Sequence, residues 1–191
     1  MLAQYLEPSF QRVPINWIMN KNIYFILVAV SVITHSLRSI YEILKYKKIL
    51  RPDKLSFVVM FINMGLLWTS WFELCRHDLY RMNLAGILQY FGFLLFALGV
   101  IIFFISLGTI KTFESYEGDL ITKGIYSKVR HPMYLGFILW LLGFPIFYEA
   151  LSSCILSFLF IANILFWRYL EEKELEERYI SYKDYKKTTI F

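Results

Sequence analysis

Long apolar runs separated by short polar segments dominate this chain. Five runs approach the roughly 20 mostly apolar residues that a helix needs to cross a bilayer. They cover residues 23–40, 55–75, 83–110, 133–148 and 151–169. The third run is longer than the hydrocarbon core is thick, so we expect it to tilt or protrude. Only Glu149 and Ala150 separate the short fourth run from the fifth, which predicts a tight helical hairpin.

The composition supports an all-α integral membrane protein with five transmembrane helices. Hydrophobic residues make up 58% of the 191 residues and charged residues only 18%. Soluble domains contain about 45–50% apolar and about 25% charged residues. The excess excludes a disordered, collagen-like or coiled-coil chain. The length fits one membrane domain, residues 1–191, with three spans in residues 1–110 and two in residues 111–191.

Lysine and arginine are distributed unevenly among the loops. With five spans, sixteen of the 20 fall at the end of the first span and its loop, in the loop after the third span and in the C-terminal segment. Because positively charged loops stay in the cytosol, this predicts an external N-terminus and a cytosolic C-terminus. We expect the first span to be retained, since no signal-peptide pattern surrounds it. The net charge of +5 then reflects topology rather than nucleic-acid binding, and Cys75 and Cys154 predict neither a metal site nor a disulfide framework.

The loop between the third and fourth runs carries the most informative residues. It reads GDLITKGIYSKVRHPMYLG from Gly118 to Gly136. Pro132 suits the first turn of a helix, which places His131 at a helix start, where free N–H groups can bind an anion. Gly118 and Gly124 allow the backbone to turn and to approach a ligand. Taken alone, a histidine in such a position is more often a cap or an interface anchor than a functional group.

The C-terminal segment predicts a charged helix that continues the fifth span. Arg168 and Glu172 are four residues apart and share a face at the membrane surface. Glu174 and Arg178 form a second pair of this kind, which we interpret as a weak surface contact. Arg168 either extends to the lipid head groups or binds a carboxylate through two parallel N–H···O hydrogen bonds. Its position in the sequence leaves both interpretations open.

In combination, these segments form a more specific pattern. The stretch L-I-T-x-G-x-Y-x-x-x-R-H-P-x-Y-x-G at residues 120–136 is followed by E-E-x-x-L at residues 171–175 and by Tyr182 and Tyr185. This pattern resembles the isoprenylcysteine carboxyl methyltransferase family, which is related to phospholipid methyltransferases. The resemblance covers about residues 118–187, and the length and span count are similar to those of minimal prokaryotic members.

The resemblance implies an S-adenosyl-L-methionine-dependent carboxyl O-methyltransferase. Its acceptor would be a prenylated cysteine or a similar lipophilic molecule that reaches the site from the membrane lipids, and S-adenosyl-L-homocysteine would be the second product. The resemblance makes residues 111–191 the catalytic, cofactor-binding region. The active site would face the cytosol, between the third loop, the start of the fourth helix and the extension of the fifth. A carboxylate is already ionised at neutral pH, so no general base is required.

Matched positions imply the following roles. Arg168 would hold the acceptor carboxylate, and Glu172 would bind a polar group of the cofactor. The residues implied to bind the cofactor are Gly118, Asp119, Leu120, Ile121, Tyr126, His131, Pro132, Met133, Tyr134, Glu171 and Glu172. Gly118 and Asp119 lie just outside the motif. Family members often continue from E-E-x-x-L to a Phe-Gly pair that is missing here. The alignment can therefore shift by one residue, so that either Glu171 or Glu172 could match the glutamate that binds the cofactor. We prefer Glu172 because it shares a helix face with Arg168.

Three alternatives stay open at this point. A phospholipid amine N-methyltransferase would need a base for its ammonium acceptor, and Glu171 or His131 could serve. A membrane reductase with a nicotinamide cofactor shares this C-terminal architecture but is longer. A non-enzymatic transporter or scaffold would need a polar pathway through the membrane. The buried polar candidates for such a pathway, which interhelical hydrogen bonds explain well, are His35, Asn63, Gln89 and Asn163.

Overall fold

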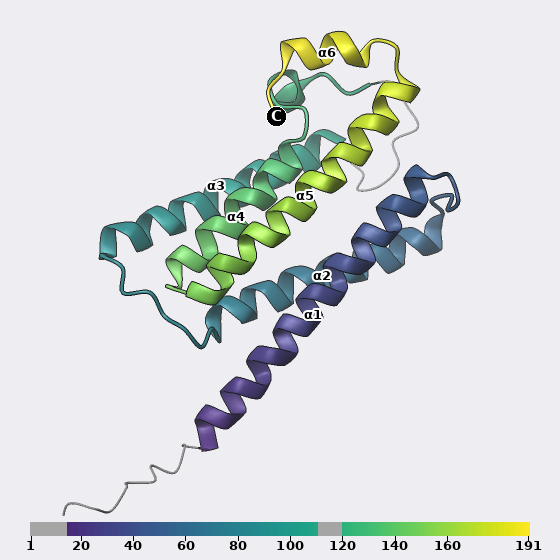
Figure 1. The fold of residues 1–191 in the computed structure, drawn as a ribbon. Coiled ribbons are helices and arrows are strands. Elements are labelled where there is room, and N and C mark those ends of the chain that lie inside the picture. The colour runs from purple at the N-terminus through teal and green to yellow at the C-terminus, as the bar shows by residue number, and fades with distance from the viewer. Residues whose placement is uncertain (1–14, 111–119) are drawn as a thin grey trace, which may run out of the picture.

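The computed structural model describes residues 15–110 and 120–191, with side chains from residue 21 onward (Figure 1). Its long helices are α1 (Ile15–Tyr46), α2 (Lys54–Arg76), α3 (Gly86–Ile110), α4 (Pro132–Phe147) and α5 (Leu151–Arg178). A short 3-10 helix, η1 (Gly124–Ser127), precedes α4, and α6 (Tyr182–Thr188) follows α5. The described part contains no β-strands, so the all-α prediction is confirmed there.

All five predicted apolar segments are helical, but only four have the length of a membrane span. The helices α1, α2, α3 and α5 are long and apolar enough to cross a bilayer. Helix α4 is equally apolar but has only 16 residues. The charged extension of the fifth segment is confirmed, because α5 continues for 28 residues to Arg178.

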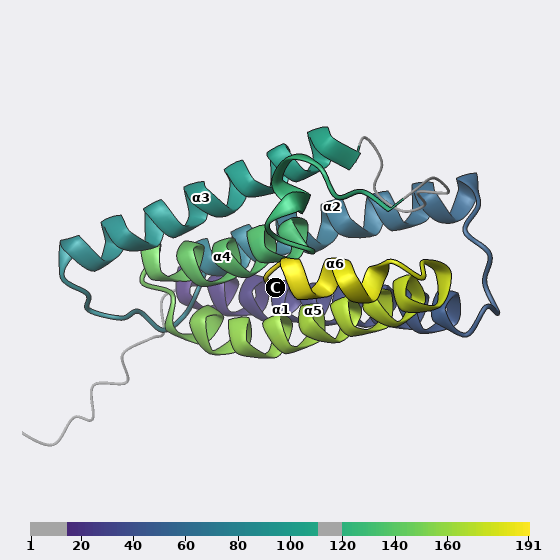
Figure 2. The same ribbon diagram turned by 90° about the horizontal axis from the view of Figure 1, so that it is seen from above.

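The five long helices lie side by side in one bundle (Figures 1 and 2). Helix α3 packs along α4, α1 packs along α2, and α5 contacts both α4 and α1. The predicted hairpin between α4 and α5 is confirmed and turns at Glu149, whose φ is 54°. The α1–α2 loop, η1 and α6 gather at the opposite end of the bundle, here called the basic end (Figure 1). The cytosolic placement of this end stays a prediction.

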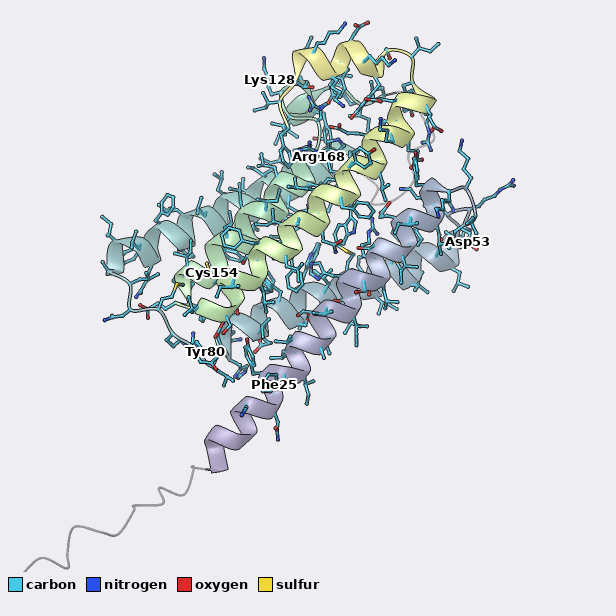
Figure 3. The ribbon with its side chains drawn as sticks, in the orientation of Figure 1. Phe25, Asp53, Tyr80, Lys128, Cys154 and Arg168 are labelled. Atoms are coloured by element: carbon cyan, nitrogen blue, oxygen red, sulfur yellow. The ribbon has the colours of Figure 1, made fainter. Side chains whose placement is uncertain are left out.

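Side-chain caps fix the ends of two helices. The Asp53 carboxylate accepts a hydrogen bond from the Ser56 backbone N–H at 2.7 Å, and the Ser56 hydroxyl accepts one from the Asp53 N–H at 2.8 Å. This reciprocal capping box starts α2 at the basic end, where Figure 3 labels Asp53. At the other end, Asp78 accepts hydrogen bonds from both the backbone N–H and the hydroxyl of Ser153 at 2.7 Å, close to the start of α5.

Glycines allow α3 and α4 to pack backbone against backbone. A Cβ atom at Gly99 would come within 2.6 Å of the Gly136 carbonyl oxygen, and one at Gly136 within 2.7 Å of the Gly99 oxygen. Gly92 and Gly143 form a second pair of this kind farther along the two helices. Small residues are the usual means of close helix approach in membranes. This seam fixes α4, and with it the position of the residues at its first turn.

Hydrogen bonds between helices explain part of the buried polar content. The Asn63 amide donates to the Thr34 carbonyl oxygen at 3.1 Å, and the Ser39 hydroxyl donates to Asn163 at 2.7 Å. The interhelical bonds expected for Asn63 and Asn163 are therefore confirmed. His35 instead pairs within α1, where its Nδ1 lies 2.9 Å from the Ser31 carbonyl oxygen.

The glycine seam generates a stability prediction. Gly99→Ala should lower the Tm of the purified protein in detergent, because the new methyl group meets the α4 backbone and overpacking costs about 1–3 kcal/mol. Gly108→Ala in the same helix is the matched control. A Cβ atom there meets nothing within 4 Å, so its Tm should stay unchanged or rise slightly. Equal effects of the two substitutions would contradict the close α3–α4 contact.

Candidate functional site

A cavity of about 190 Å³ lies at the basic end of the bundle. One wall comes from α2 and carries no charge. Its residues are Phe57, Met60, Phe61, Met64, Gly65 and Trp68. The remaining walls contain all of the charged groups. These groups are Arg38, Glu42 and Lys45 of α1, Arg130 before α4, and Glu171 of α5, and the His131 imidazole lies beside them. The cavity can therefore accommodate an apolar and a polar group at the same time.

The first turn of α4 brings His131 between two glutamates. Pro132 occupies the first turn and His131 the N-cap position, as predicted, although the imidazole makes no capping hydrogen bond. Its Nε2 lies 3.4 Å from a Glu172 carboxylate oxygen, and its Nδ1 lies 3.8 Å from a Glu171 oxygen. The ring stacks on Tyr134 with 5.7 Å between the centroids. These contacts orient His131 at the edge of the cavity.

Glu172 is a buried carboxylate surrounded by basic groups. Lys186 Nζ donates to one oxygen at 2.8 Å, and Arg130 Nε lies 3.3 Å from the other. Arg168 shares the predicted face with Glu172 but is farther away, with 3.9 Å between its Nε and the carboxylate. The hydrogen bond to Glu172 raises the pKa of Lys186, which keeps the amine charged. A buried charge is tolerated only when it is paired in this way.

The C-terminal residues bind to the segment before α4. The Arg130 guanidinium donates to the Thr189 carbonyl oxygen at 2.6 Å, and its backbone N–H donates to the Ile190 oxygen at 3.0 Å. The His131 N–H donates to the Phe191 oxygen at 3.3 Å. The Phe191 ring lies 4.6 Å from the Arg168 guanidinium carbon. Figure 3 shows Arg168 on α5 at the same end of the bundle as Lys128.

The paired tyrosines of the motif contact the same segment. The Tyr182 hydroxyl lies 3.4 Å from Nε2 of His131, and the Tyr185 hydroxyl donates to the Tyr126 carbonyl oxygen at 2.6 Å. Helix α6 thus holds both η1 and the start of α4. This arrangement explains why two tyrosines three residues apart accompany the upstream motif.

Tyr126 lines the cavity with an unpartnered hydroxyl. The side chain is only 6% exposed, and its hydroxyl has no hydrogen-bond partner among the described residues. Burial raises the pKa of this hydroxyl, and the charge of Glu171 adds to the shift, so it stays a neutral donor at physiological pH. Buried polar groups are nearly always paired, so this hydroxyl is a candidate for a ligand contact, and the Ser106 side chain, whose hydrogen bond opposes the rise in pKa, is the competing partner.

The structure brings five of the predicted cofactor residues to the cavity wall. They are Tyr126, His131, Met133, Tyr134 and Glu171. Leu120, Ile121, Pro132 and Glu172 lie outside the lining, and Gly118 and Asp119 lie outside the described residues. Of the two adjacent glutamates, Glu171 lines the cavity. Glu172 lies outside the lining and forms ion pairs with Arg130 and His131, which do line it.

Arg168 does not line the cavity, so its predicted contact with an acceptor stays a prediction. Sequence reasoning missed the contributions of α1 and α2. A signal was present, because Arg38, Glu42 and Lys45 recur at four- and three-residue intervals near the end of an apolar run. The sequence includes Arg130 in the R-H-P motif and among the positive charges of its loop, but predicts no role for it in the site.

Comparison with known proteins supports the resemblance read from the sequence. A sequence model of the family described as phospholipid methyltransferase matches residues 87–181, about half of the chain. Protein-S-isoprenylcysteine O-methyltransferase of Schizosaccharomyces pombe is 35% identical over 75 residues. That alignment covers 36% of this chain and 30% of the yeast protein, so this chain matches less than a third of that relative's length. No solved structure matches the chain significantly.

The family match extends from the beginning of α3 to the residue before α6, and it includes the R-H-P motif and both glutamates. The yeast relative carries the name of the family that the motif resembles. The resemblance to the isoprenylcysteine carboxyl methyltransferases is thereby confirmed, and residues 87–181 of this chain match the sequence model of the phospholipid methyltransferase family.

Proposed function

We propose that the protein is an S-adenosylmethionine-dependent methyltransferase that methylates the carboxylate of a prenylated cysteine or a similar lipophilic acceptor, from a site facing the cytosol. The observation that carries this proposal is the cavity with one apolar and several polar walls. A water-soluble donor and a lipophilic acceptor must meet without bulk water between them. A cavity at the end of a membrane bundle, with this division of its walls, suits both.

The residues around the cavity fit the proposed cofactor. The unpartnered Tyr126 hydroxyl, the His131 ring and the Glu171 carboxylate offer polar contacts, whereas Met133 and Tyr134 offer flat or flexible apolar ones. When bound, S-adenosylmethionine supplies an activated methyl group: the acceptor oxygen forms a bond to the methyl carbon as the carbon–sulfur bond breaks, and the electron pair stays on sulfur. No proton moves, because the acceptor is already a carboxylate.

The protein's own contribution is then to position the reactants and to exclude water. Glu172 acts as a positioning residue, because it orients His131 and Arg130 without lining the cavity. Arg168 contacts Glu172 and the Phe191 ring, and we assign it a supporting role in this cluster. This assignment differs from the contact with the acceptor that the sequence predicts.

A second candidate is methylation of a phospholipid amine. The description of the matching family names phospholipids, and the carboxylates of Glu42 and Glu171 both line the cavity. An ammonium acceptor must first lose a proton, and a carboxylate within reach could accept it. The choice of acceptor therefore has to be measured.

The proposed function predicts methyl transfer from labelled S-adenosylmethionine. Purified protein in nanodiscs should methylate N-acetyl-S-farnesyl-L-cysteine in preference to phosphatidylethanolamine, and calorimetry should detect S-adenosylhomocysteine binding in the micromolar range. Glu171→Gln should weaken this binding, because Glu171 lines the cavity, whereas Glu177→Gln on the exposed face of α5 should not. Preference for the phospholipid would support the second candidate, and absence of both binding and transfer would refute the proposal.

A further prediction concerns the buried hydroxyl of Tyr126. Tyr126→Phe should leave the Tm of the ligand-free protein unchanged or raise it, since burying an unpaired polar group costs about 1–3 kcal/mol. The same substitution should weaken S-adenosylhomocysteine binding several-fold. Tyr185→Phe serves as a contrast: it removes the hydrogen bond to the Tyr126 carbonyl oxygen and should lower the Tm. A Tm loss for Tyr126→Phe with unchanged affinity would show that this hydroxyl serves the fold and not a ligand.

A further inference from the structure

A second, small cavity of about 10 Å³ lies deeper in the bundle than the large one. Its lining residues belong to α1, α2, α4 and α5, which also line the large cavity. On α1 it is lined by His35, whereas the large cavity is lined by side chains between residues 38 and 45. On α5 it is lined by Ile164 and Trp167, whereas the large cavity is lined by Glu171. The small cavity therefore continues the large one along the bundle axis, away from the basic end.

Three side chains form the boundary between the two cavities, here called the floor of the large cavity. Met64 and Trp68 of α2 and Phe137 of α4 line both spaces, so they stand between them. Apart from His35, whose ring stacks on Phe160 with 3.8 Å between the centroids, the small cavity is lined by aliphatic, aromatic and methionine side chains. The large cavity thus changes from charged walls near the basic end to an apolar floor.

Trp68 is the rigid member of this floor. Its ring meets three others edge-on, with centroid distances of 5.1 Å to Trp140, 5.3 Å to Phe103 and 5.4 Å to Phe137. Aromatic pairs prefer such edge-to-face contacts, and rotation of the indole out of the floor would break all three. Met64 has an unbranched, flexible side chain that adapts to its surroundings. The indole therefore fixes the depth of the cavity, whereas Met64 can yield.

We propose that Trp68 determines the tail length of the lipid acceptor, because its indole is the floor on which the end of the tail stops. The charged groups near the basic end suit the polar donor and the acceptor carboxylate, which leaves the apolar floor to the tail. The space beneath the floor has room for about one water molecule, so no further chain segment fits there. Removal of the indole would join the two cavities and deepen the site. The assignment rests on the proposed function, since it concerns the acceptor of the same site.

Photo-crosslinking locates the end of the tail without relying on turnover. The probe is N-acetyl-S-farnesyl-L-cysteine with a diazirine in its last isoprene unit, added to the full-length protein in phosphatidylcholine nanodiscs. The label should map to Met64, Trp68 or Phe137, and unlabelled N-acetyl-S-farnesyl-L-cysteine should compete for it. A label confined to the exposed face of α2, for example at Ile62 and Leu66, would place the tail in the surrounding lipid and overturn the proposal.

Two substitutions should shift the tail-length selectivity in opposite directions. The selectivity is the ratio of the concentrations at which the S-geranylgeranyl and the S-farnesyl analogue each halve the labelling; partitioning into lipid cancels when variants are compared. Trp68→Leu deepens the site and should lower this ratio at least about tenfold. Met64→Phe fills space at the floor and should raise it. Loss of stability alone cannot produce opposite shifts, and an unchanged ratio in both variants would overturn the proposal.

Phe72→Leu is the matched control. Phe72 lies one turn from Trp68 on α2 and packs against the rings of Phe96 and Phe144, with centroid distances of 5.9 Å and 4.8 Å, but it lines neither of the two cavities. This substitution should lower the Tm, because it truncates a packed aromatic side chain, and should leave the tail-length selectivity unchanged. An equal shift of selectivity in Phe72→Leu and Trp68→Leu would show that loosened packing is the cause. If Trp68→Leu does not fold, the smaller truncation Trp68→Phe takes its place.

These measurements separate the role of Trp68 from the proposed function. If the floor is labelled and Trp68→Leu shifts the selectivity, but the protein neither binds S-adenosylhomocysteine nor transfers methyl groups, the proposed function fails while the lipid site stands. If methyl transfer occurs but the selectivity of Trp68→Leu equals that of the unsubstituted protein, the role of Trp68 is refuted while the proposed function stands.

Discussion

The buried carboxylate of Glu172 is the contact on which the arrangement at the basic end depends. It lies close to Lys186 of α6, Arg130 before α4 and Nε2 of His131. A carboxylate in this position requires such partners, because an unpaired buried charge is strongly destabilising. One side chain of α5 thus holds both the segment before α4 and helix α6. The orientation of His131 and the docking of the C-terminal residues follow from it.

The glycine seam in the apolar part of the bundle complements this ionic cluster. Gly99 and Gly136 fix α4 against α3 by close backbone contact, and Glu172 fixes the first turn of α4 from the opposite side. Between these two constraints, Tyr126 and Glu171 are held at a cavity that also reaches an apolar wall on α2. Residues of the family match and residues of the first two helices both line this space.

Sequence patterns sufficed to predict the long helices but not the cavity. Apolar run lengths predicted every long helix, Pro132 predicted the start of α4, and the spacing of Arg168 and Glu172 predicted their shared face. These are local properties of a helix. The lining by α1 and α2 depends on tertiary packing, which neither periodicity nor a resemblance limited to residues 118–187 can report. Arg168 also contacts the ring of Phe191, a residue outside any pattern in the chain.

The most direct test of the central claim is an experimental structure of the full chain in nanodiscs with S-adenosylhomocysteine. The account predicts the nucleoside inside the cavity at the basic end, in contact with Tyr126 and Tyr134, with Glu172 still paired to Arg130 and Lys186. A nucleoside bound at the opposite end of the bundle, or outside the space between α1, α2, α4 and α5, would contradict it.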